Sequence, residues 1–335
     1  MFDAQMSDKK SLVKQTVALL RKRGKKSLEI ARHSIEQDEI KHQPLRDALR
    51  YFADEMFAHI GHPGLLSVYC EAVGGDPDKT IQIGAAMVML VSAADIHDDL
   101  IDESMVKNRK RTLLGKYGKD VAILAGDAFL MKGMYLLDDA ILKFPMNKRN
   151  AVLGLIKQAF FDLSSAEAEE AAQRGNIELS GPLFFELIKG KSAVSEATGR
   201  IGAVLADGTE RDVQNLGEIG YIVGLLGTMR DEFIDVFEPH ELNNRFVGEI
   251  LPLPVLYVFQ DSAKKNRILE LLKEGMLTKK KTEEIVGIVM GAKEIEILKA
   301  EMFLLIEQGL ASLTTLSGAK EPLRLLLEST TEDLR

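Results

Sequence analysis

Two short groups of acidic residues have the spacing expected of a metal site on a helix. The first acidic row comprises Asp98, Asp99 and Asp102, with Asp95 one turn earlier. Residues three or four apart lie on one face of a helix, so these carboxylates would repel one another unless a cation binds. Magnesium takes few carboxylate ligands and completes its shell with water and phosphate oxygens. The first row therefore predicts a magnesium site that could hold a phosphorylated substrate.

The second acidic row comprises Asp231, Glu232 and Asp235, near the end of another apolar segment. In a chain with 51 acidic residues among 335, this pattern is expected about once by chance, so the spacing alone is weak support. Each row also ends a mostly apolar segment that should be buried, and this context favours a metal site. The alternative is that each row is a solvated helix end or a set of capping acids.

Basic residues lie between and beside the two rows. Lys191 follows Gly190 in an apolar segment, although a single lysine on a helix is more often a surface residue whose stem covers apolar neighbours. The segment Lys107–Thr112 carries four cations in six residues. Such a run is usually a solvated loop, but beside a metal cluster it could bind a diphosphate.

The rest of the sequence predicts an all-α fold in one domain. Hydrophobic residues make up 46% of the chain and charged residues 28%, as in folded proteins. Apolar residues recur at helical spacing, and alternating β-type runs are missing. Helices are expected at 9–33, 44–58, 64–73, 78–104, 118–141, 147–174, 182–206, 210–237, 264–275, 281–293, 295–315 and 320–333. No linker divides the chain, and the segment from residue 264 onward is expected to form a peripheral helical layer.

Composition and charge exclude several classes of function. The net charge of −8 argues against a nucleic-acid partner. The longest apolar run, Ile81–Ala94, is shorter than the roughly 18 residues that a membrane span needs. We find no secretion signal, and the single cysteine, Cys70, cannot form an internal disulfide. We therefore expect a cytoplasmic protein without a transmembrane segment.

The order of motifs along the chain resembles that of the trans-isoprenyl diphosphate synthase (polyprenyl synthetase) family, from about residue 40 to 260. The matching segments are Gly74–Pro77, Ile96–Asp102, Leu124–Asp127, Arg174-Gly175, Gly190–Ala193, Gly220–Asp235 and Leu253-Pro254. The resemblance implies a single large helical bundle of the isoprenoid synthase type around a deep central cavity, usually assembled as a homodimer. Two aspartate-rich segments would face each other across the cavity and bind about three magnesium ions.

The resemblance also assigns roles to individual residues. The expected metal ligands are Asp98, Asp102 and Asp231, with Asp99, Glu232 and Asp235 in support. The expected catalytic residues are Asp98, Asp102, Asp231 and Lys191, of which Lys191 would contact the allylic diphosphate. The residues expected to bind substrates are Lys191, Ser192, Lys107, Arg109, Arg111, His59, His62, Ala93 and Ala94.

The main departure from the family concerns the site of the second substrate, isopentenyl diphosphate. A Gly-Lys-Arg segment of the family is replaced by a stretch that contains His59 and His62, and its adjacent arginines align with Lys107 and Asn108. Two lost charge-assisted contacts of ~1.5–3 kcal/mol each would weaken binding by orders of magnitude. Three explanations remain open: a substitute site that includes the histidines and nearby arginines, another acceptor, or cyclisation without an acceptor.

Other departures concern the allylic half and the cavity. The chain has Glu249 where the family has a lysine in its Gly-Lys-x-Thr-Leu-Pro segment, and Glu170 where it has a helical glutamine. The small residues Ala93 and Ala94 precede the first aspartate where the family limits product length, so we expect room for a prenyl chain of about C15–C20 or more. We therefore predict a magnesium-dependent prenyltransferase that joins an allylic prenyl diphosphate to a second isoprenoid.

Two other functions fit the same motifs. One is a class I terpene cyclase-like enzyme that uses a single diphosphate. The other is a regulatory subunit of a heteromeric prenyl synthase, against which the retained aspartates argue.

Overall fold

The computed structural model describes residues 11–37, 39–57, 61–107, 110–273, 275 and 277–332. Within these ranges the chain is almost entirely helical, and its sheet is a two-stranded hairpin of Val106–Lys107 (β1) and Lys110–Arg111 (β2). The prediction of an all-α fold is confirmed.

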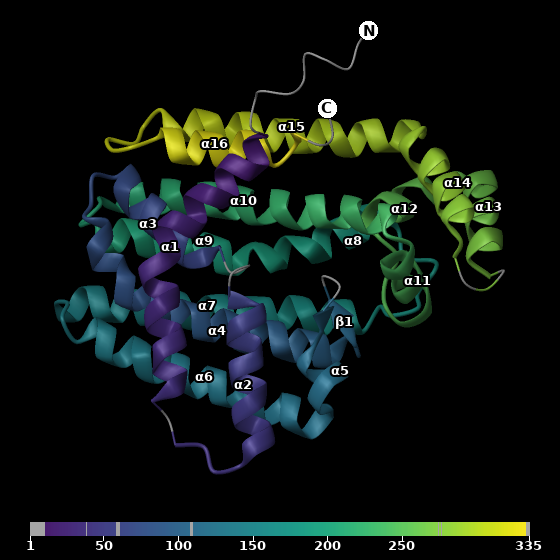
Figure 1. Cartoon of the computed structure of the whole chain (residues 1–335). Helices are drawn as coiled ribbons and strands as arrows, with labels where there is room; N and C mark the ends of the chain where they lie inside the picture. The colour runs from purple at the N-terminus through teal and green to yellow at the C-terminus, as the bar shows by residue number, and fades with distance from the viewer. Residues whose placement is uncertain are drawn as a thin grey trace, which may run out of the picture.

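The helices form stacked layers that one long helix crosses. They are α1 (Leu12–Glu36), α2 (Gln43–Glu55), α3 (His62–Ala72), α4 (Ile81–Ile101), α5 (Leu113–Tyr117), α6 (Lys119–Ile141), α7 (Met146–Ala171), α8 (Gly181–Lys189), α9 (Ala193–Leu205), α10 (Glu210–Phe237), α11 (Pro239–Gly248), α12 (Leu253–Val258), α13 (Ser262–Lys273), α14 (Lys279–Met290), α15 (Lys293–Leu313) and α16 (Glu321–Ser329). In Figure 1, α15 and α16 lie along one edge, with α10, α9 and α8 beneath them and α4, α6 and α7 in the other half. Helix α1 runs across these layers and contacts α16, α3 and α4.

Helix α4 carries the first acidic row, and local sequence explains where it begins. The Asp76 side chain accepts a hydrogen bond from the backbone N–H of Asp78, and Pro77 opens the 3-10 turn η2 (Pro77–Thr80) that leads into the helix. Most of α4 is apolar and buried, packed against α1, α3 and α6. The acidic row falls in its last two turns, where the helix leaves the core.

Helix α10 carries the second acidic row. It begins with a capping box in which the side chains of Thr209 and Asp212 each accept a hydrogen bond from the other residue's backbone N–H. Its path against α9 depends on two glycines: a Cβ added at Gly199 would lie 2.0 Å from the carbonyl oxygen of Leu216, and one at Gly220 would lie 2.4 Å from that of Ser195. This close packing fixes the second row relative to the segment before α9.

The hydrophobic core reaches from α3 to α16. The largest cluster of buried residues joins side chains of α3, α8, α10 and α12 to side chains such as Ile285, Leu298, Met302 and Leu327 of the C-terminal helices. The helices from residue 264 onward therefore share the main core through their inner faces, while α15 and α16 lie along one edge of the molecule. A second cluster joins α1, α2, α4 and α6 beneath the first acidic row.

The N-terminus of α1 is capped by a residue from the other end of the described chain. Both carboxylate oxygens of Glu332 accept hydrogen bonds at the start of α1, from Ser11 Oγ at 2.5 Å, from the Leu12 N–H at 2.9 Å and from the Val13 N–H at 2.9 Å. A carboxylate at this position satisfies N–H groups that have no partner within the helix and complements its dipole.

Several elements were not expected from the sequence. The β1–β2 hairpin, α5, α11 and α12 lie in segments that we left unassigned, because short elements carry little periodicity. The helix expected at 182–206 is broken by a 3-10 turn, η3 (Gly190–Ser192), between α8 and α9. This break places Lys191 on a turn.

One helical segment has the length and composition of a membrane span. It is Pro77–Ile101, and 61% of its most apolar window is buried inside the structure. A core helix passes the same test, so this segment is weak support for a membrane span.

Candidate active site

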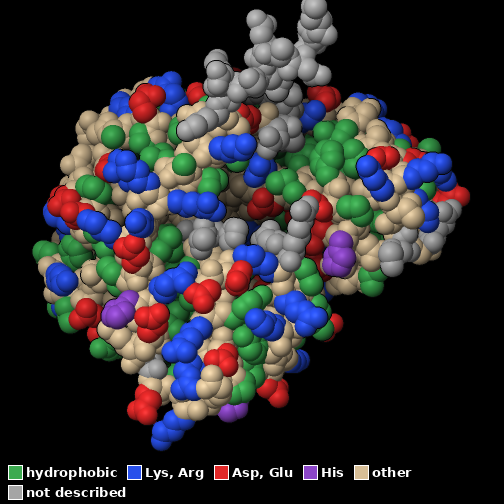
Figure 2. Space-filling model, in the orientation of Figure 1, with side chains coloured by type: hydrophobic (Ala, Val, Ile, Leu, Met, Phe, Trp, Pro, Cys, Tyr) green, Lys and Arg blue, Asp and Glu red, His purple; other side chains and the backbone are tan. Residues whose placement is uncertain are grey.

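The two acidic rows face a common space. Burial raises the pKa of Asp231 in the second row, and the positive charge of Lys107, which contacts the first row, opposes this rise. The negative charges of Asp102 and Asp98 in turn raise the pKa of Glu249, which follows α11. Figure 2 shows a hollow between the two halves of the molecule, with acidic and basic side chains around it. The rows are therefore close enough to act together.

The first row surrounds the ammonium group of Lys107. Its Nζ lies 2.6 Å from Asp95 Oδ1, 3.3 Å from Asp99 Oδ1 and 3.8 Å from Asp98 Oδ2. Burial disfavours the charge on Lys107, but these three carboxylates raise its pKa above the ordinary value. Burial, together with repulsion from Asp95 and Asp98, raises the pKa of Asp99 to about 7. Lys107 thus neutralises much of the first row.

Asp102 has a different partner. Its Oδ1 accepts a hydrogen bond from Arg174 at 2.5 Å, across 72 residues of sequence. The turn that bears Arg174 is anchored, because the N–H of Gly175 donates to the carbonyl oxygen of Glu249 at 2.9 Å. Burial and the charge of Asp98 raise the pKa of Asp102. We had noted Arg174 only as part of the family's motif order and had given it no role.

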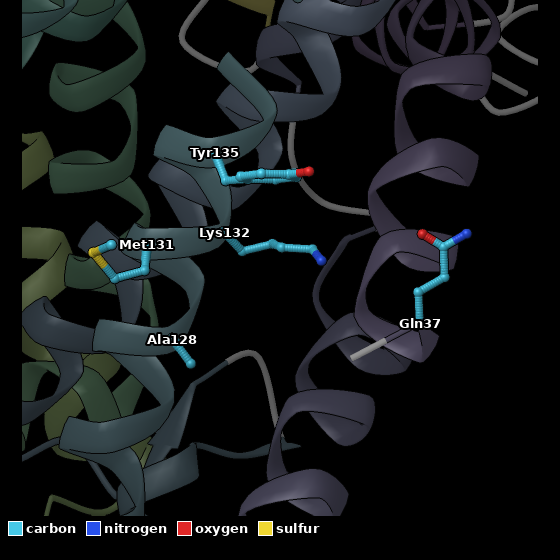
Figure 3. A pocket seen from close by; sticks show the side chains of 5 residues that line it. All are labelled: Gln37, Ala128, Met131, Lys132 and Tyr135. Carbon is cyan, nitrogen blue, oxygen red and sulfur yellow. The ribbon is translucent and has the colours of Figure 1, made fainter. Parts of the chain in front are cut away.

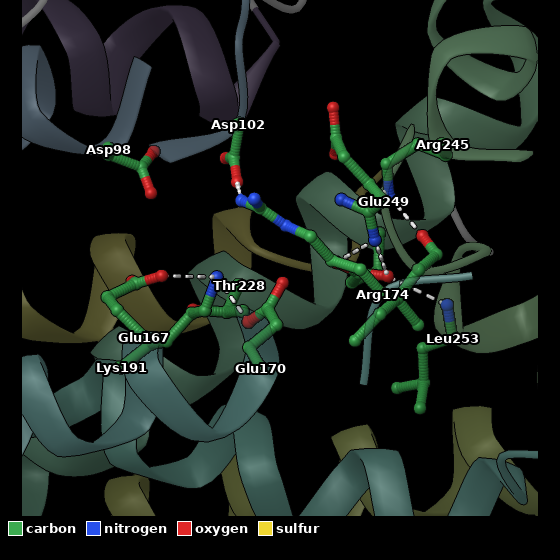
Figure 4. A network of polar contacts seen from close by, with 12 residues as sticks. Asp98, Asp102, Glu167, Glu170, Arg174, Lys191, Thr228, Arg245, Glu249 and Leu253 are labelled. Carbon is green, nitrogen blue, oxygen red and sulfur yellow. Dashed lines mark hydrogen bonds and ion pairs between the residues drawn. The ribbon is translucent and has the colours of Figure 1, made fainter. Parts of the chain in front are cut away.

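Lys191 points into the same network from η3. Its Nζ lies 2.6 Å from Glu170 Oε2 and 3.5 Å from Glu167 Oε2 (Figure 4). Burial disfavours its charge, but Glu170, Glu167 and Asp98 raise the pKa of Lys191 above its ordinary value. Its neighbour Ser192 is fully buried. The binding of substrate by Ser192 stays a prediction, and its side chain has no exposed surface in this arrangement.

The second row contains one exposed carboxylate, Asp231, and two carboxylates, Glu232 and Asp235, that form ion pairs with the buried Arg245. Asp231 is exposed, whereas Glu232 is buried. Arg245 donates from Nη2 to both oxygens of Glu232 at 2.7 and 2.8 Å and from Nη1 to Asp235 Oδ2 at 3.3 Å. The backbone N–H of Leu253 donates to Glu232 Oε2 at 2.7 Å.

The arrangement around Arg245 concerns two of the expected supporting metal ligands. Both oxygens of Glu232 accept hydrogen bonds from inside the protein, so binding of a metal by Glu232 would require these bonds to be exchanged. Asp235 is half-buried, and burial raises its pKa to about 7 despite the nearby charge of Arg245. Arg245 itself lies on α11, in a segment for which we predict no helix.

The donor set suits a divalent cation that a diphosphate shares. Burial raises the pKa of Asp99, Asp235, Glu167 and Glu249 to about 7 in each case, and neighbouring carboxylates add to the effect. A surplus of carboxylates in a half-buried space is stabilised by a cation. Within the described ranges no group of three acidic, His or Cys side chains has the geometry of a metal site. Magnesium bound at these rows would therefore take much of its coordination from phosphate and water.

A comparison with known families decides the class of protein. A family model described as Polyprenyl synthetase matches residues 56–289, more than half of the chain. The chain belongs to the polyprenyl synthetase family. The resemblance drawn from the order of its motifs is thereby confirmed.

Individual relatives and solved structures agree with this family. A geranylgeranyl diphosphate synthase from Sulfolobus acidocaldarius is 25% identical over 173 residues, 51% of this chain and 52% of the relative. Geranylgeranyl pyrophosphate synthase 11, chloroplastic, of Arabidopsis thaliana is 30% identical over 186 residues, 52% of each chain. The matches thus span about half the length of these curated relatives. The structure of a geranylgeranyl pyrophosphate synthetase from Pyrococcus horikoshii Ot3 has a TM-score of 0.82 at 22% identity, covering 96% of this chain and 99% of that one, which shows the same fold.

In this polyprenyl synthetase, the structure describes part of the set of residues expected to bind the second substrate. His59 and Arg109 lie outside the described residues. Burial lowers the pKa of His62 to about 4, so at neutral pH this side chain would contact a diphosphate as a neutral hydrogen-bond donor. Lys107 and Arg111 line a narrow cleft beside Asp99, but Lys107 is directed to the first row and Arg111 is exposed.

The two alanines before the first row lie in different surroundings. Ala94 is half-buried, one helical turn before Asp98 and on the same face of α4. Ala93 is buried and belongs to the apolar cluster that contains Phe52 and Phe129. Of the two, Ala94 is placed to line the space below the acidic row, whereas Ala93 packs into the core.

The raised carboxyl pKa values make a prediction about pH. Burial raises the pKa of Glu249 from about 4.5 to about 7, so the folded protein keeps a proton that the unfolded chain releases. Without metal, we expect the free energy of unfolding to decrease as the pH rises through this window. Urea unfolding followed by circular dichroism at several pH values measures the slope. Glu249→Gln should reduce it, and an unchanged slope would contradict the prediction.

Proposed function

We propose that this chain is a magnesium-dependent prenyltransferase that ionises an allylic prenyl diphosphate of about C15–C20 or more and joins it to a second isoprenoid. The observation that carries the proposal is the shared space between the two acidic rows, with Lys191 at its edge. Membership of the polyprenyl synthetase family and the names of the relatives, which are prenyl diphosphate synthases, support the same activity.

In this proposal the chain's residues bind, orient and shield the substrate. Asp98, Asp102 and Asp231 hold the magnesium ions, of which the family resemblance implies about three. When bound, these ions supply the positive charge that makes pyrophosphate a good leaving group. Lys191 donates hydrogen bonds to the diphosphate. The apolar surface of α4 below the row, including Ala94, receives the prenyl chain and keeps water from the allylic cation.

The second substrate binds in a non-standard way in this proposal. His62 is uncharged at neutral pH, and Lys110 is occupied by Glu55, whose Oε2 lies 2.6 Å from its Nζ. A second diphosphate would therefore find few free cations near α3 and the β hairpin. This supports an acceptor other than isopentenyl diphosphate, or a condensation with a different geometry.

One incubation tests the function and its alternative. The protein is incubated with magnesium and radiolabelled C15 or C20 allylic diphosphate, with and without isopentenyl or dimethylallyl diphosphate. A larger prenyl product that requires the second diphosphate supports the transferase. A hydrocarbon or alcohol formed from the single substrate would instead identify a terpene cyclase-like enzyme. Activity only after addition of a partner synthase would identify a regulatory subunit.

We also propose that the chain acts as one domain, in the cytoplasm, and forms a homodimer through α6. The exposed apolar side chains of this helix include Leu124, Met131 and Tyr135, which lie on one face at helical spacing. Figure 3 shows Met131 and Tyr135 beside Lys132 at an open hollow of about 430 Å³ that Gln37 closes on the other side. An apolar face of this kind is typical of subunit interfaces.

The dimer proposal makes its own prediction. Sedimentation should give about twice the chain mass of 37.1 kDa. Tyr135→Glu should shift the protein to the monomer, because it places a charge in the apolar interface. Ile297→Glu, at an exposed apolar residue of α15, is the matched control and should leave the dimer intact. A monomeric parent protein, or a Tyr135→Glu variant that stays dimeric, would contradict the proposal.

A further inference from the structure

The first acidic row is already neutralised in part by two of the chain's own cations. Lys107 contacts Asp95, Asp98 and Asp99, and Arg174 contacts Asp102. These cations come from different places, the β hairpin after α4 and the turn after α7. Every carboxylate of the row therefore has an internal partner in the ligand-free structure.

The ion pair between Arg174 and Asp102 is accessible to a ligand that could replace either partner. Both side chains are 30% exposed at their contact, so a ligand can approach them. The backbone of the turn is held by the bond from Gly175 to Glu249, which leaves the side chain as the part free to move. Figure 4 shows the guanidinium group directed at Asp102 from the side opposite α4, with Lys191 below it.

The buried pair in the second row differs in each of these respects. The Arg245 side chain is only 10% exposed and that of Glu232 7%. Arg245 also donates to the carbonyl oxygen of Ile250 at 2.6 Å, which fixes it further. Removing Arg245 would leave the buried carboxylate of Glu232 unpaired. Moving the Arg174 side chain would instead leave the carboxylate of Asp102 accessible to a ligand.

We propose that Arg174 is a further diphosphate-binding residue, held on Asp102 until metal and diphosphate arrive together. On loading, Asp102 exchanges the guanidinium for the metal ion, and Arg174 exchanges the carboxylate for a diphosphate oxygen. Lys107 makes the same exchange on Asp95, Asp98 and Asp99. No covalent bond changes, and each charge keeps an opposite partner throughout. The proposal rests on the metal site of the proposed function.

The exchange makes metal and diphosphate binding mutually dependent. Magnesium alone must compete with two tethered cations, and pyrophosphate alone must compete with the carboxylates. When both bind, the metal ion releases Arg174 and Lys107 from the carboxylates, and these two cations then bind the diphosphate. By reciprocity, the factor by which pyrophosphate strengthens magnesium binding equals the factor by which magnesium strengthens pyrophosphate binding.

Calorimetric titration of the full chain tests the proposal without an activity assay. The probes are magnesium alone, inorganic pyrophosphate alone, and pyrophosphate at saturating magnesium. For Arg174→Met we expect tighter binding of magnesium alone and about tenfold or greater weakening of pyrophosphate in the presence of magnesium, the size of one charge-assisted hydrogen bond. Arg174→Lys should restore part of the pyrophosphate affinity. Circular dichroism confirms that each variant is folded.

The matched control is Arg200→Met. Arg200 forms a partly exposed ion pair with Glu196 on α9, so this variant also removes an arginine–carboxylate pair but none that contacts the acidic rows. It should leave all three affinities unchanged. If Arg174→Met weakens magnesium alone, the arginine only orients Asp102 and the proposal is wrong. If it leaves the affinity for pyrophosphate with magnesium unchanged, Arg174 does not bind the diphosphate.

Failure of the proposed function gives a different result. If the parent protein binds neither magnesium nor pyrophosphate when both are present at millimolar concentration, the metal site itself is refuted. Cooperative binding in the parent that persists in Arg174→Met refutes only the exchange.

Discussion

Asp98→Asn and Asp231→Asn are each expected to lower the rate of diphosphate ionisation by about 100-fold or more. Each change removes one negative charge from a row and leaves the size of the side chain almost the same. Asp98 is half-buried and Asp231 is exposed, so neither change opens a cavity in the core. Pyrophosphate release from radiolabelled C15 or C20 allylic diphosphate measures the rate, and far-ultraviolet circular dichroism measures helix content.

Asp138→Asn is the matched control for these two variants. Asp138 is an exposed aspartate on α6, so its loss changes net charge by the same amount and should leave the rate unchanged. Activity close to that of the parent protein in either row variant would refute the assignment of that carboxylate. A loss of helix content would show instead that the residue supports the fold.

Arg245→Leu is expected to give the largest loss of stability of any single substitution considered for this chain. It leaves Glu232 buried without its counter-charge, and breaking a buried pair in this way costs about 3–5 kcal/mol. Burial disfavours the charge on Arg245, but Glu232 and Asp235 together raise its pKa, so the guanidinium group stays charged in the native state. Urea unfolding followed by circular dichroism measures the free energy of unfolding.

A second variant separates the pair from the rest of the arginine's contacts. In Arg245→Leu/Glu232→Gln no unpaired charge is buried, so part of the lost stability should return. Arg267→Leu is the control on α13, where exposed pairs with Glu270 and Glu284 should contribute little to stability. Equal losses for Arg245→Leu and Arg267→Leu would show that burial of the pair does not matter.

The parts of the fold that could be predicted from the sequence are those that local patterns determine. Helices α4 and α10 have long apolar segments and acidic rows at helical spacing. Periodicity acts over a few residues, so it indicates these helices without knowledge of what packs against each of them. The prediction that the two rows share one space came from the family resemblance.

The parts that could not be predicted depend on partners far apart in the chain. Arg174 contacts Asp102, which is 72 residues away in the sequence, and no local pattern predicts this contact. Arg245 lies on α11, a short helix in a segment for which we predict no helix from the sequence. The burial of His62 and Ser192 depends on how α3 and η3 pack, and spacing along the chain does not encode this.

The contact between Glu332 and the start of α1 has a consequence for how this protein is made. Helix α1 lacks this acceptor for its leading N–H groups until Glu332 has been synthesised. Helix α1 also crosses both halves of the molecule, so its final placement has to wait for α16. We expect nascent chains stalled before α16 to remain sensitive to proteases near residue 12, and released chains to become resistant.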